Sequence, residues 1–347
     1  MQMKVIDPTF ELALVSPFLL QTLADVVVDK GFDAAILCRG LGFGLDDLQD
    51  PTHRISHRQA VVMIQRALKL LPDQGLGLWV GDRNVLGTLG LLGHVLSLCE
   101  TLRDVFALGV RYQRTTGGIA QISAEEAGDR ITVEATCQLP FADVQVFAVE
   151  EFFASVLVYG RALAASDFKP QAVEFMHAAP SYAGEYQRIF GSVVRFGCRQ
   201  NRMLIDAGWL EVRLPNHHPL ALRQALALLE QEASEVHQKI DLIQAVERAI
   251  ARDLGRGSHI DKIASDLNMS SRTLRRRLTE HNLTFEALLE QVRRGRTLNL
   301  LANPELSIER ITEEVGYSDV RSFRRAFRRW TGMSPSAFRN ESADARL

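Results

Sequence analysis

The sequence has few cysteines and no long apolar run, and each shortage excludes a class of protein. Its 347 residues contain four cysteines, separated by 61, 38 and 61 residues. This spacing suits neither the disulfide framework of a small secreted domain nor a zinc knuckle, so we expect reduced, buried thiols. No apolar stretch reaches the ~20 residues that a membrane-spanning helix needs. The nearest candidate, from Val85 to Cys99, contains three glycines and is predicted to be a core helix.

A secretory signal is also missing from the N-terminal residues. Lys4 is followed by Asp7, Pro8 and Glu11 rather than by an apolar run and a small-residue cleavage site. We therefore expect a cytoplasmic protein without a membrane segment. Apolar residues make up 46% of the chain and charged residues 24%, which is typical of packed globular domains. The length predicts about two of them.

Positive charge is concentrated in the C-terminal quarter, although the formal net charge of the whole chain is only −2. Residues 256–340 hold 16 Lys and Arg against 10 Asp and Glu, whereas the rest holds 24 against 32. Fifteen of those 16 cations are arginines, whose planar guanidinium groups suit phosphates and base edges. A basic segment joined to an acidic body indicates an anionic partner.

A short repeat with an offset of 48 residues organises the basic segment. In both copies, which begin at Ile260 and Ile308, apolar residues recur at i, i+3 and i+7. This spacing predicts a two-turn helix with one buried face. Asn268 and Gly316 then stand where the chain leaves each helix, a position that often adopts left-handed backbone angles.

Each copy continues into a second amphipathic helix, predicted at 271–278 and at 319–330. At 100° per residue, apolar side chains share one face of each helix and arginines occupy the others. The apolar faces consist of Leu274 and Leu278 in the first helix, and of Phe323, Phe327 and Trp330 in the second. We predict that the aromatic face is part of the core and does not stack on bases.

Two helices joined by a tight turn, the second presenting cations, form a helix-turn-helix, whose second helix lies in the major groove of DNA. Between the two copies, the pattern predicts a helix from Phe285 to Leu301. At 17 residues it is about 25 Å long, which would separate the two reading helices by about one turn of DNA.

The region before residue 215 predicts an α+β domain. Helical patterns dominate through Leu108, with a capping box from Ser56 to Gln59. Strand patterns then predict a hairpin of 119–123 and 130–136, with its turn in 125–129, and short strands near 173–176, 193–196 and 203–206. A helix is predicted between them, from about Gln145 to Ala164.

Residues 242–340 resemble the DNA-binding domain of the AraC/XylS transcription regulators, an all-α domain of two helix-turn-helix units joined by a linker helix. The most specific part runs from Val315-Gly-Tyr-Ser-Asp to Phe323-Arg-Arg-Ala-Phe-Arg-Arg-Trp-Thr-Gly-Met-Ser-Pro335. Thr297 and Thr312 stand where the family usually has alanine, and Gly295 interrupts the linker helix. The resemblance implies DNA-reading residues at Arg272, Arg275, Arg276, Val320, Arg321, Arg324 and Arg325.

The N-terminal region resembles the effector and oligomerisation domain of one branch of that family, which includes regulators of ornithine use and of virulence. The resemblance rests on Gly90-Leu-Leu-Gly-His94, Tyr186-Gln-Arg-Ile-Phe-Gly191 and Val194-Arg-Phe-Gly197. It implies an effector-binding and dimerisation domain at 1–214, a linker at 215–239, a DNA-binding domain at 240–340 and a tail at 341–347.

We therefore expect a homodimeric regulator that binds double-stranded DNA at a promoter, responds to a small-molecule effector and needs no cofactor. A contact with RNA polymerase is compatible with this class. One alternative is a ligand-independent regulator whose N-terminal domain only dimerises or contacts a partner protein. Another is an enzyme with a DNA-binding appendage, as in relatives that repair alkylated DNA through a zinc-bound cysteine. The repair-enzyme alternative requires that the fold bring several cysteines close together.

Other candidate sites have simpler interpretations. His53 and His57 are four residues apart, as in some helical metal sites, but the Ser56 cap places His53 before the helix. We expect no metal there. The glycine-rich stretch 40–44 is predicted to be a turn, because the strand, helix and lysine of a phosphate loop are missing. Glu150 and Glu151 are interpreted as exposed acidic residues near a helix N-terminus rather than as an acid/base pair.

Overall fold

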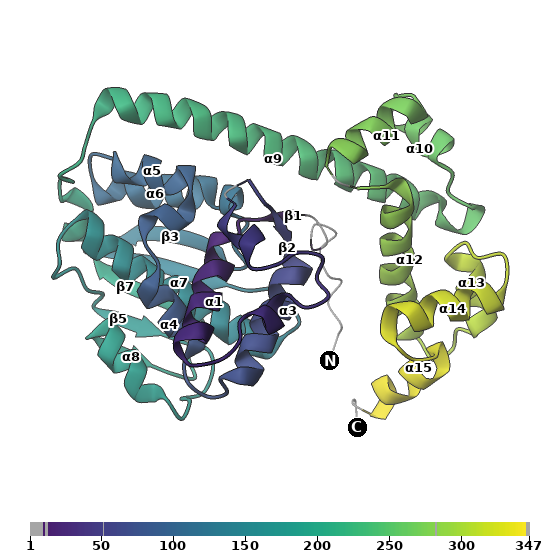
Figure 1. Ribbon diagram of the computed structural model, residues 1–347, viewed down its shortest axis with the longest axis horizontal. Helices are drawn as coiled ribbons and strands as arrows, with labels where there is room; N and C mark the ends of the chain where they lie inside the picture. Colours follow the sequence, from purple (N-terminus) through teal and green to yellow (C-terminus); the bar gives the residue numbers. More distant parts are fainter. Residues whose placement is uncertain (1–9, 11–12, 51, 282, 345–347) are drawn as a thin grey trace. The chain divides into compact units, whose positions relative to one another are not determined.

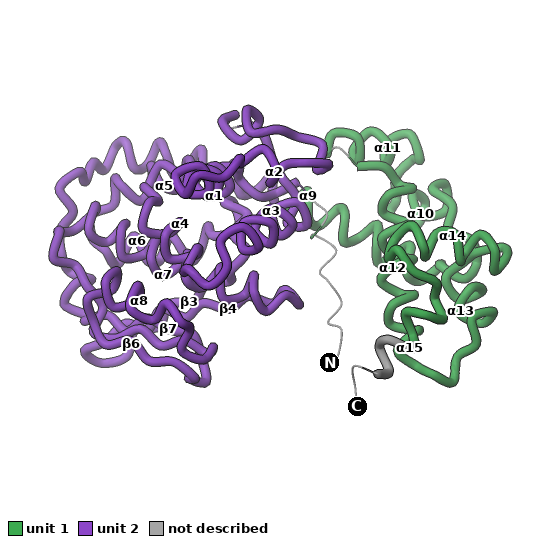
Figure 2. Tube along the Cα trace, turned by 60° about the horizontal axis from the view of Figure 1, so that its bottom comes forward, with its two compact units in different colours: residues 1–10, 237–347 green, residues 11–236 purple. Residues whose placement is uncertain are grey.

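The computed structural model describes residues 10, 13–50, 52–281 and 283–344. They divide into two compact units (Figure 2). The N-terminal unit is Glu11–Val236, and the C-terminal unit contains the helices after His237. The first mixes helices with sheets and the second is helical, which confirms the predicted α+β domain followed by an all-α domain.

A five-stranded sheet with the order β3-β4-β7-β5-β6 forms one layer of the N-terminal unit (Figure 1). β5 and β6 are parallel, and the other neighbours are antiparallel. A separate pair, β1 and β2, is also antiparallel. The strands are β1 (Ala13–Val15), β2 (Ile55–Ser56), β3 (Gln121–Ala127), β4 (Arg130–Thr136), β5 (Ala172–Glu174), β6 (Val193–Arg195) and β7 (Arg202–Asp206).

Helices make up the rest of the N-terminal unit. α7 packs closely on α4, where a Cβ atom on Gly81 would lie only 2.3 Å from the carbonyl oxygen of Glu151. Glycine therefore permits this close approach of the two backbones. The helices are α1 (Phe18–Asp29), α2 (Ala35–Cys38), α3 (His57–Leu70), α4 (Leu76–Arg83), α5 (Leu91–Ser97), α6 (Leu102–Tyr112), α7 (Ala142–Leu163) and α8 (Ala183–Phe190), with 3-10 helices at Asp46–Gln49, Leu86–Leu89, Gln113–Thr116 and Ala207–Glu211.

Local signals identified the start of α3 correctly. The Ser56 hydroxyl accepts a hydrogen bond from the backbone N–H of Gln59, and the Gln59 side chain accepts one from the backbone N–H of Ser56 at 2.8 Å. This reciprocal pair is the predicted capping box. His53 lies before the helix, and its ring packs 5.7 Å from that of Phe43.

Two predictions of element bounds were wrong. The first strand of the hairpin does not end at Ser123 but continues to Ala127, because the turn needs only Gly128, with φ 64°, and Asp129. The predicted core helix from Val85 to Cys99 is instead a 3-10 turn followed by α5. Gly90 adopts φ 59° between them, and this backbone geometry ends the first turn.

The C-terminal unit contains the predicted succession of helices. The linker helix α12 has the predicted bounds, Phe285–Leu301, and passes through Gly295 without a break. Thr297 on this helix is fully buried, and its hydroxyl donates to the carbonyl oxygen of Arg293 at 2.7 Å, which satisfies the polar group inside the core. The helices are α9 (Pro219–Asp253), which begins in the N-terminal unit, α10 (Ile260–Asp266), α11 (Ser271–Glu280), α12, α13 (Ile308–Glu314), α14 (Val320–Thr331) and α15 (Pro335–Asp344), with a 3-10 helix at Leu254–Arg256.

No helix among the described residues is both long and apolar enough to cross a membrane.

Candidate nucleic-acid interface and ligand cavity

The first helix-turn-helix consists of α10 and α11. Asn268 adopts φ 55° at the end of α10, and the backbone N–H of Met269 donates to the carbonyl oxygen of Ala264 at 2.9 Å. Ser270 then caps α11 by accepting a hydrogen bond from the backbone N–H of Thr273 at 3.1 Å. The left-handed residue and the cap together turn the chain sharply between the two helices.

The second helix-turn-helix, α13 and α14, repeats this geometry. Gly316 adopts φ 75° after α13, as the repeat predicts. Asp319 caps α14 by accepting a hydrogen bond from the backbone N–H of Ser322 at 2.7 Å. The predicted left-handed backbone at both turns is therefore confirmed.

The linker helix α12 holds the second helix-turn-helix in place. The Arg293 guanidinium donates to the carbonyl oxygens of Val315 at 3.0 Å and Gly316 at 2.6 Å, and it lies 4.5 Å from the centre of the Tyr317 ring. One turn away, Glu290 accepts a hydrogen bond from the indole of Trp330 at 2.5 Å. Arg293 thus satisfies carbonyls that the end of α13 leaves free.

Apolar side chains fix which faces of α11 and α14 point outward. Leu274 and Leu278 are buried on α11, as are Phe323 and Phe327 on α14. The predicted core role of the aromatic face is confirmed, with Trp330 half-buried at its end. The residues that the resemblance assigns to DNA reading lie on the other faces. Val320 is half-buried, and Arg272, Arg275, Arg276, Arg321, Arg324 and Arg325 are exposed.

Ion pairing divides the arginines into two groups. Arg276 pairs with Glu280 on its own helix at 2.5 Å, and Arg329 pairs with Glu290 at 2.6 Å. Within the described part of the chain, no carboxylate lies within ion-pair distance of the other five arginines in the predicted set, Arg272, Arg275, Arg321, Arg324 and Arg325. Their donors remain available to an anionic partner.

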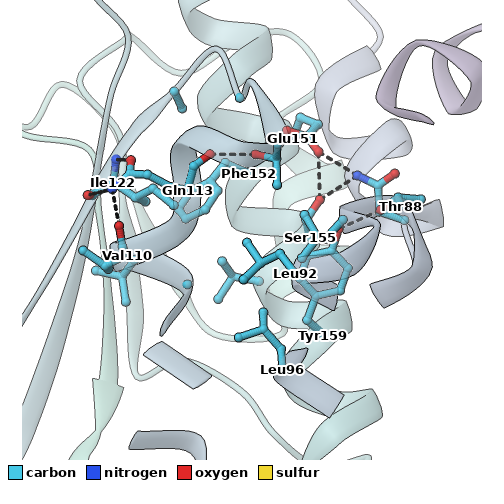
Figure 3. Close-up of a pocket in the computed structure, with 18 of the residues that line it drawn as sticks. Thr88, Leu92, Leu96, Val110, Gln113, Ile122, Glu151, Phe152, Ser155 and Tyr159 are labelled. Carbon is cyan, nitrogen blue, oxygen red and sulfur yellow. Dashed lines mark hydrogen bonds between the residues drawn. The ribbon is translucent and has the colours of Figure 1, made fainter. Parts of the chain in front are cut away.

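The N-terminal unit contains a cavity of about 200 Å³ between α5, α6, α7 and β3 (Figure 3). Apolar side chains dominate its wall, among them Leu92, Phe106, Val110, Phe152 and Phe168. An apolar lining of this kind is typical of a small-molecule site.

One side of the cavity carries a polar cluster built on α7 (Figure 3). Asn84 donates to Glu151 Oε1 at 2.6 Å and to Ser155 Oγ at 2.8 Å. Ser155 donates to the same carboxylate oxygen at 2.9 Å. Burial raises the pKa of Glu151 to about 7, although the hydrogen bonds from Ser155 and Asn84 lower it.

The structure corrects the interpretation of the two acidic residues as exposed. Glu150 is only 2% exposed, accepts hydrogen bonds from Tyr186 and, at 2.8 Å, from Tyr182, and has its pKa raised to about 7 by burial. Glu151 lines the cavity. Both lie in the middle of α7, where Glu150 is buried and Glu151 is half-buried beside the cavity. The sequence did contain a signal for this burial, because apolar residues flank the Glu150-Glu151 pair on both sides.

A helical unit with two helix-turn-helix motifs, each presenting arginines, and an α+β unit with an apolar cavity define a DNA-binding transcription regulator. The comparisons give the family. The arabinose-binding N-terminal domain of AraC transcription regulators matches residues 31–214, and a helix-turn-helix domain matches residues 263–341. The chain therefore belongs to the AraC family, which confirms the predicted resemblance.

Similar regulators span most of the chain. An HTH-type transcriptional regulator of Mycobacterium tuberculosis is 28% identical over 323 residues, 92% of this chain and 94% of the relative. The ornithine utilization regulator of Pseudomonas aeruginosa is 24% identical over 330 residues, 95% and 97% of the two chains. The regulator VirS of M. tuberculosis is 27% identical over 276 residues, 77% and 78% of the two chains.

Proposed function

We propose that the protein binds operator DNA by placing α11 and α14 in successive segments of the major groove. The observation that carries this proposal is the set of exposed arginines on both helices, most of them without a carboxylate partner in the described structure. Arg272, Arg275, Arg276, Val320, Arg321, Arg324 and Arg325 form the proposed interface. An arginine in the major groove can donate two hydrogen bonds to one guanine, whereas phosphate contacts carry no sequence information.

Removing Arg275 or Arg321 tests which of these contacts read bases. We expect Arg275→Ala and Arg321→Ala each to weaken operator binding by ~1–3 kcal/mol and to relax the preference at one base position. The measurement is fluorescence anisotropy with an operator selected from a random DNA library and with single-base variants of it.

Arg277→Ala provides the matched control, because Arg277 is exposed on the same helix as Arg275 but lies outside the proposed interface. It should leave the base preference unchanged. An equal loss of affinity for all sequences in Arg275→Ala and Arg321→Ala would indicate phosphate contacts and contradict base reading.

The cavity of the N-terminal unit is the effector site in this proposal. Because α5, α6 and α7 all line it, a bound molecule contacts several elements of the unit at once. An effector changes operator affinity only through its different affinities for the two functional states, typically by ~1–3 kcal/mol. We favour control by an effector because a ligand-independent regulator would not need this cavity.

A homodimer and a contact with RNA polymerase complete the proposal. Leu220 and Leu228 on α9 are more than half exposed, and such apolar side chains suit a subunit interface. Two subunits would bind two half-sites. We expect sedimentation velocity to show the full chain as a dimer at micromolar concentration, and a strictly monomeric chain would remove this part of the proposal.

Catalysis has no part in the proposed function. The relatives that span most of the chain are transcription regulators. Cys38 and Cys99 are buried, whereas Cys137 and Cys198 are half-buried. Across the described residues, no three His, Cys, Asp or Glu side chains are grouped so that they could hold a metal ion.

A further inference from the structure

We propose that the cavity selects an apolar molecule with one hydrogen-bond-donating head group, an amine in preference to an alcohol, and that it excludes sugars and carboxylates. This inference rests on the proposed role of the cavity as the effector site. It departs from the sugar that the name of the matching domain suggests, because the wall of this cavity has the wrong chemistry for a sugar.

The wall offers too few polar groups for a carbohydrate. Most of the lining residues are aliphatic, aromatic or glycine, and the polar ones are Ser16, Asn84, Thr88, Gln113, Thr116, Glu151, Ser155 and Tyr159. Every buried hydroxyl of a sugar needs a hydrogen-bond partner, and a hydroxyl left without one weakens binding. An apolar ligand instead gains free energy from contact with this wall.

Several of these polar groups are already occupied by other parts of the protein. Gln113 donates to the carbonyl oxygens of Val110 at 2.8 Å and Ile122 at 2.9 Å, and it accepts from the backbone N–H of Ile122 at 2.8 Å. Thr88 donates to the carbonyl oxygen of Val85, so the 3.0 Å contact with Tyr159 is a donation from the tyrosine. Gln113 thus joins α6 to β3, and its amide group is already hydrogen-bonded to the backbone rather than available to a ligand.

Glu151 is the ionisable side chain that can recognise a head group. Its Oε1 accepts hydrogen bonds from Asn84 and Ser155, whereas its Oε2 accepts none from the residues that the structure describes. No lysine, arginine or histidine is among the residues that line the cavity. A ligand amine would donate to Oε2 and neutralise the buried carboxylate, while a ligand carboxylate would be repelled and would find no cation.

The volume limits the size of the ligand. A dry apolar cavity of about 150 Å³ holds one benzene molecule, so the 200 Å³ here suits a single aromatic ring with a short head group or a short alkyl chain. Benzylamine, benzyl alcohol and benzoate therefore provide a matched series in which only the head group changes. L-arabinose provides the sugar.

The test measures binding of these four compounds to the full chain by calorimetry at about pH 8, where the carboxylate of Glu151 is largely ionised. We expect benzylamine to bind more tightly than benzyl alcohol, and benzoate and arabinose not to bind. Glu151→Gln keeps the shape of the side chain but removes its charge. It should weaken benzylamine binding roughly tenfold or more, and benzyl alcohol binding by less than about threefold.

Gly109→Leu tests whether the probes occupy this cavity. Gly109 lines it from α6, and a Cβ atom there would meet nothing within 4 Å. Leucine can therefore fill the space without disturbing the helix backbone, and we expect it to abolish binding of both benzylamine and benzyl alcohol. Thermal melting confirms that each variant is folded.

The outcomes separate this inference from the proposed function. Preferential binding of benzoate or arabinose, or benzylamine binding that Glu151→Gln leaves unchanged, would overturn the head-group inference and leave the cavity as the effector site. Binding that survives Gly109→Leu would overturn the cavity as the site, and with it the inference. Binding of none of the four compounds would also overturn the inference, while the affinity of the full chain for DNA is measured independently by anisotropy.

Discussion

Replacing Phe327 by alanine will unfold the C-terminal unit and abolish DNA binding. The Phe327 ring is fully buried on α14. It lies 6.1 Å from the ring of Phe323, 6.3 Å from that of Trp330 and 5.6 Å from that of Phe338. Truncating a buried phenylalanine costs ~3–5 kcal/mol, which is much of the ~5–15 kcal/mol that stabilises a typical domain. Circular dichroism melts of the full chain, together with anisotropy on DNA, check this result.

Arg328→Ala on the same helix is the control for Phe327→Ala. Arg328 is exposed, so its removal should leave the melt of the C-terminal unit almost unchanged, although it can weaken DNA binding. Loss of DNA binding in Phe327→Ala with an unchanged melt would mean that the ring contacts DNA, contrary to its position in the core.

Gly316→Ala will also destabilise the C-terminal unit strongly. Alanine at φ 75° costs about 1–3 kcal/mol through backbone strain alone. The added Cβ atom would lie 2.1 Å from the carbonyl oxygen of Leu254. Because that oxygen belongs to the backbone, it cannot rotate away as the end of a side chain can. Urea unfolding of the variant measures the combined cost.

Gly332→Ala separates the two contributions at Gly316. Gly332 has a similar φ of 79°, but a Cβ atom there would meet nothing within 4 Å. Its variant should show the backbone cost without the clash and lose less stability than Gly316→Ala. Equal losses for the two variants would show that the backbone of Leu254 does not approach Gly316 as closely as described.

Local patterns in the sequence were enough to predict the architecture of the C-terminal unit. The apolar spacing of both repeat copies and the turn residues Asn268 and Gly316 are short-range features, and each helix-turn-helix is built from contacts between neighbours in the chain. The linker helix is likewise bounded by local signals, since Thr284 accepts a hydrogen bond from the backbone N–H of Ala287 and caps α12. Arg293 was missed, because its contacts with Val315 and Gly316 join residues that are far apart in sequence.

Local sequence patterns could not predict the cavity. Its wall combines residues from β1, α1, α5, α6, α7 and the sheet, and no periodicity relates side chains on so many elements. Glu151 illustrates the difficulty. An acidic residue near the expected start of a helix is usually exposed, but α7 begins earlier, at Ala142, and packs on α4 through the glycines of that helix. Burial then follows from tertiary packing rather than from the position of Glu151 in its own helix.

The attachment of α12 to the second helix-turn-helix has a consequence for the architecture of the operator. Arg293 and Glu290 hold that motif on the linker helix at two points, and only residues 281–284 separate the linker helix from α11. In our proposal α11 and α14 both read the DNA, and the protein then sets the angle between them about the DNA axis. One inserted base pair between the two contacted DNA segments rotates them by about 35° relative to each other. Operators of this regulator should accordingly keep a fixed spacing between their two sequence motifs, even where the intervening bases vary.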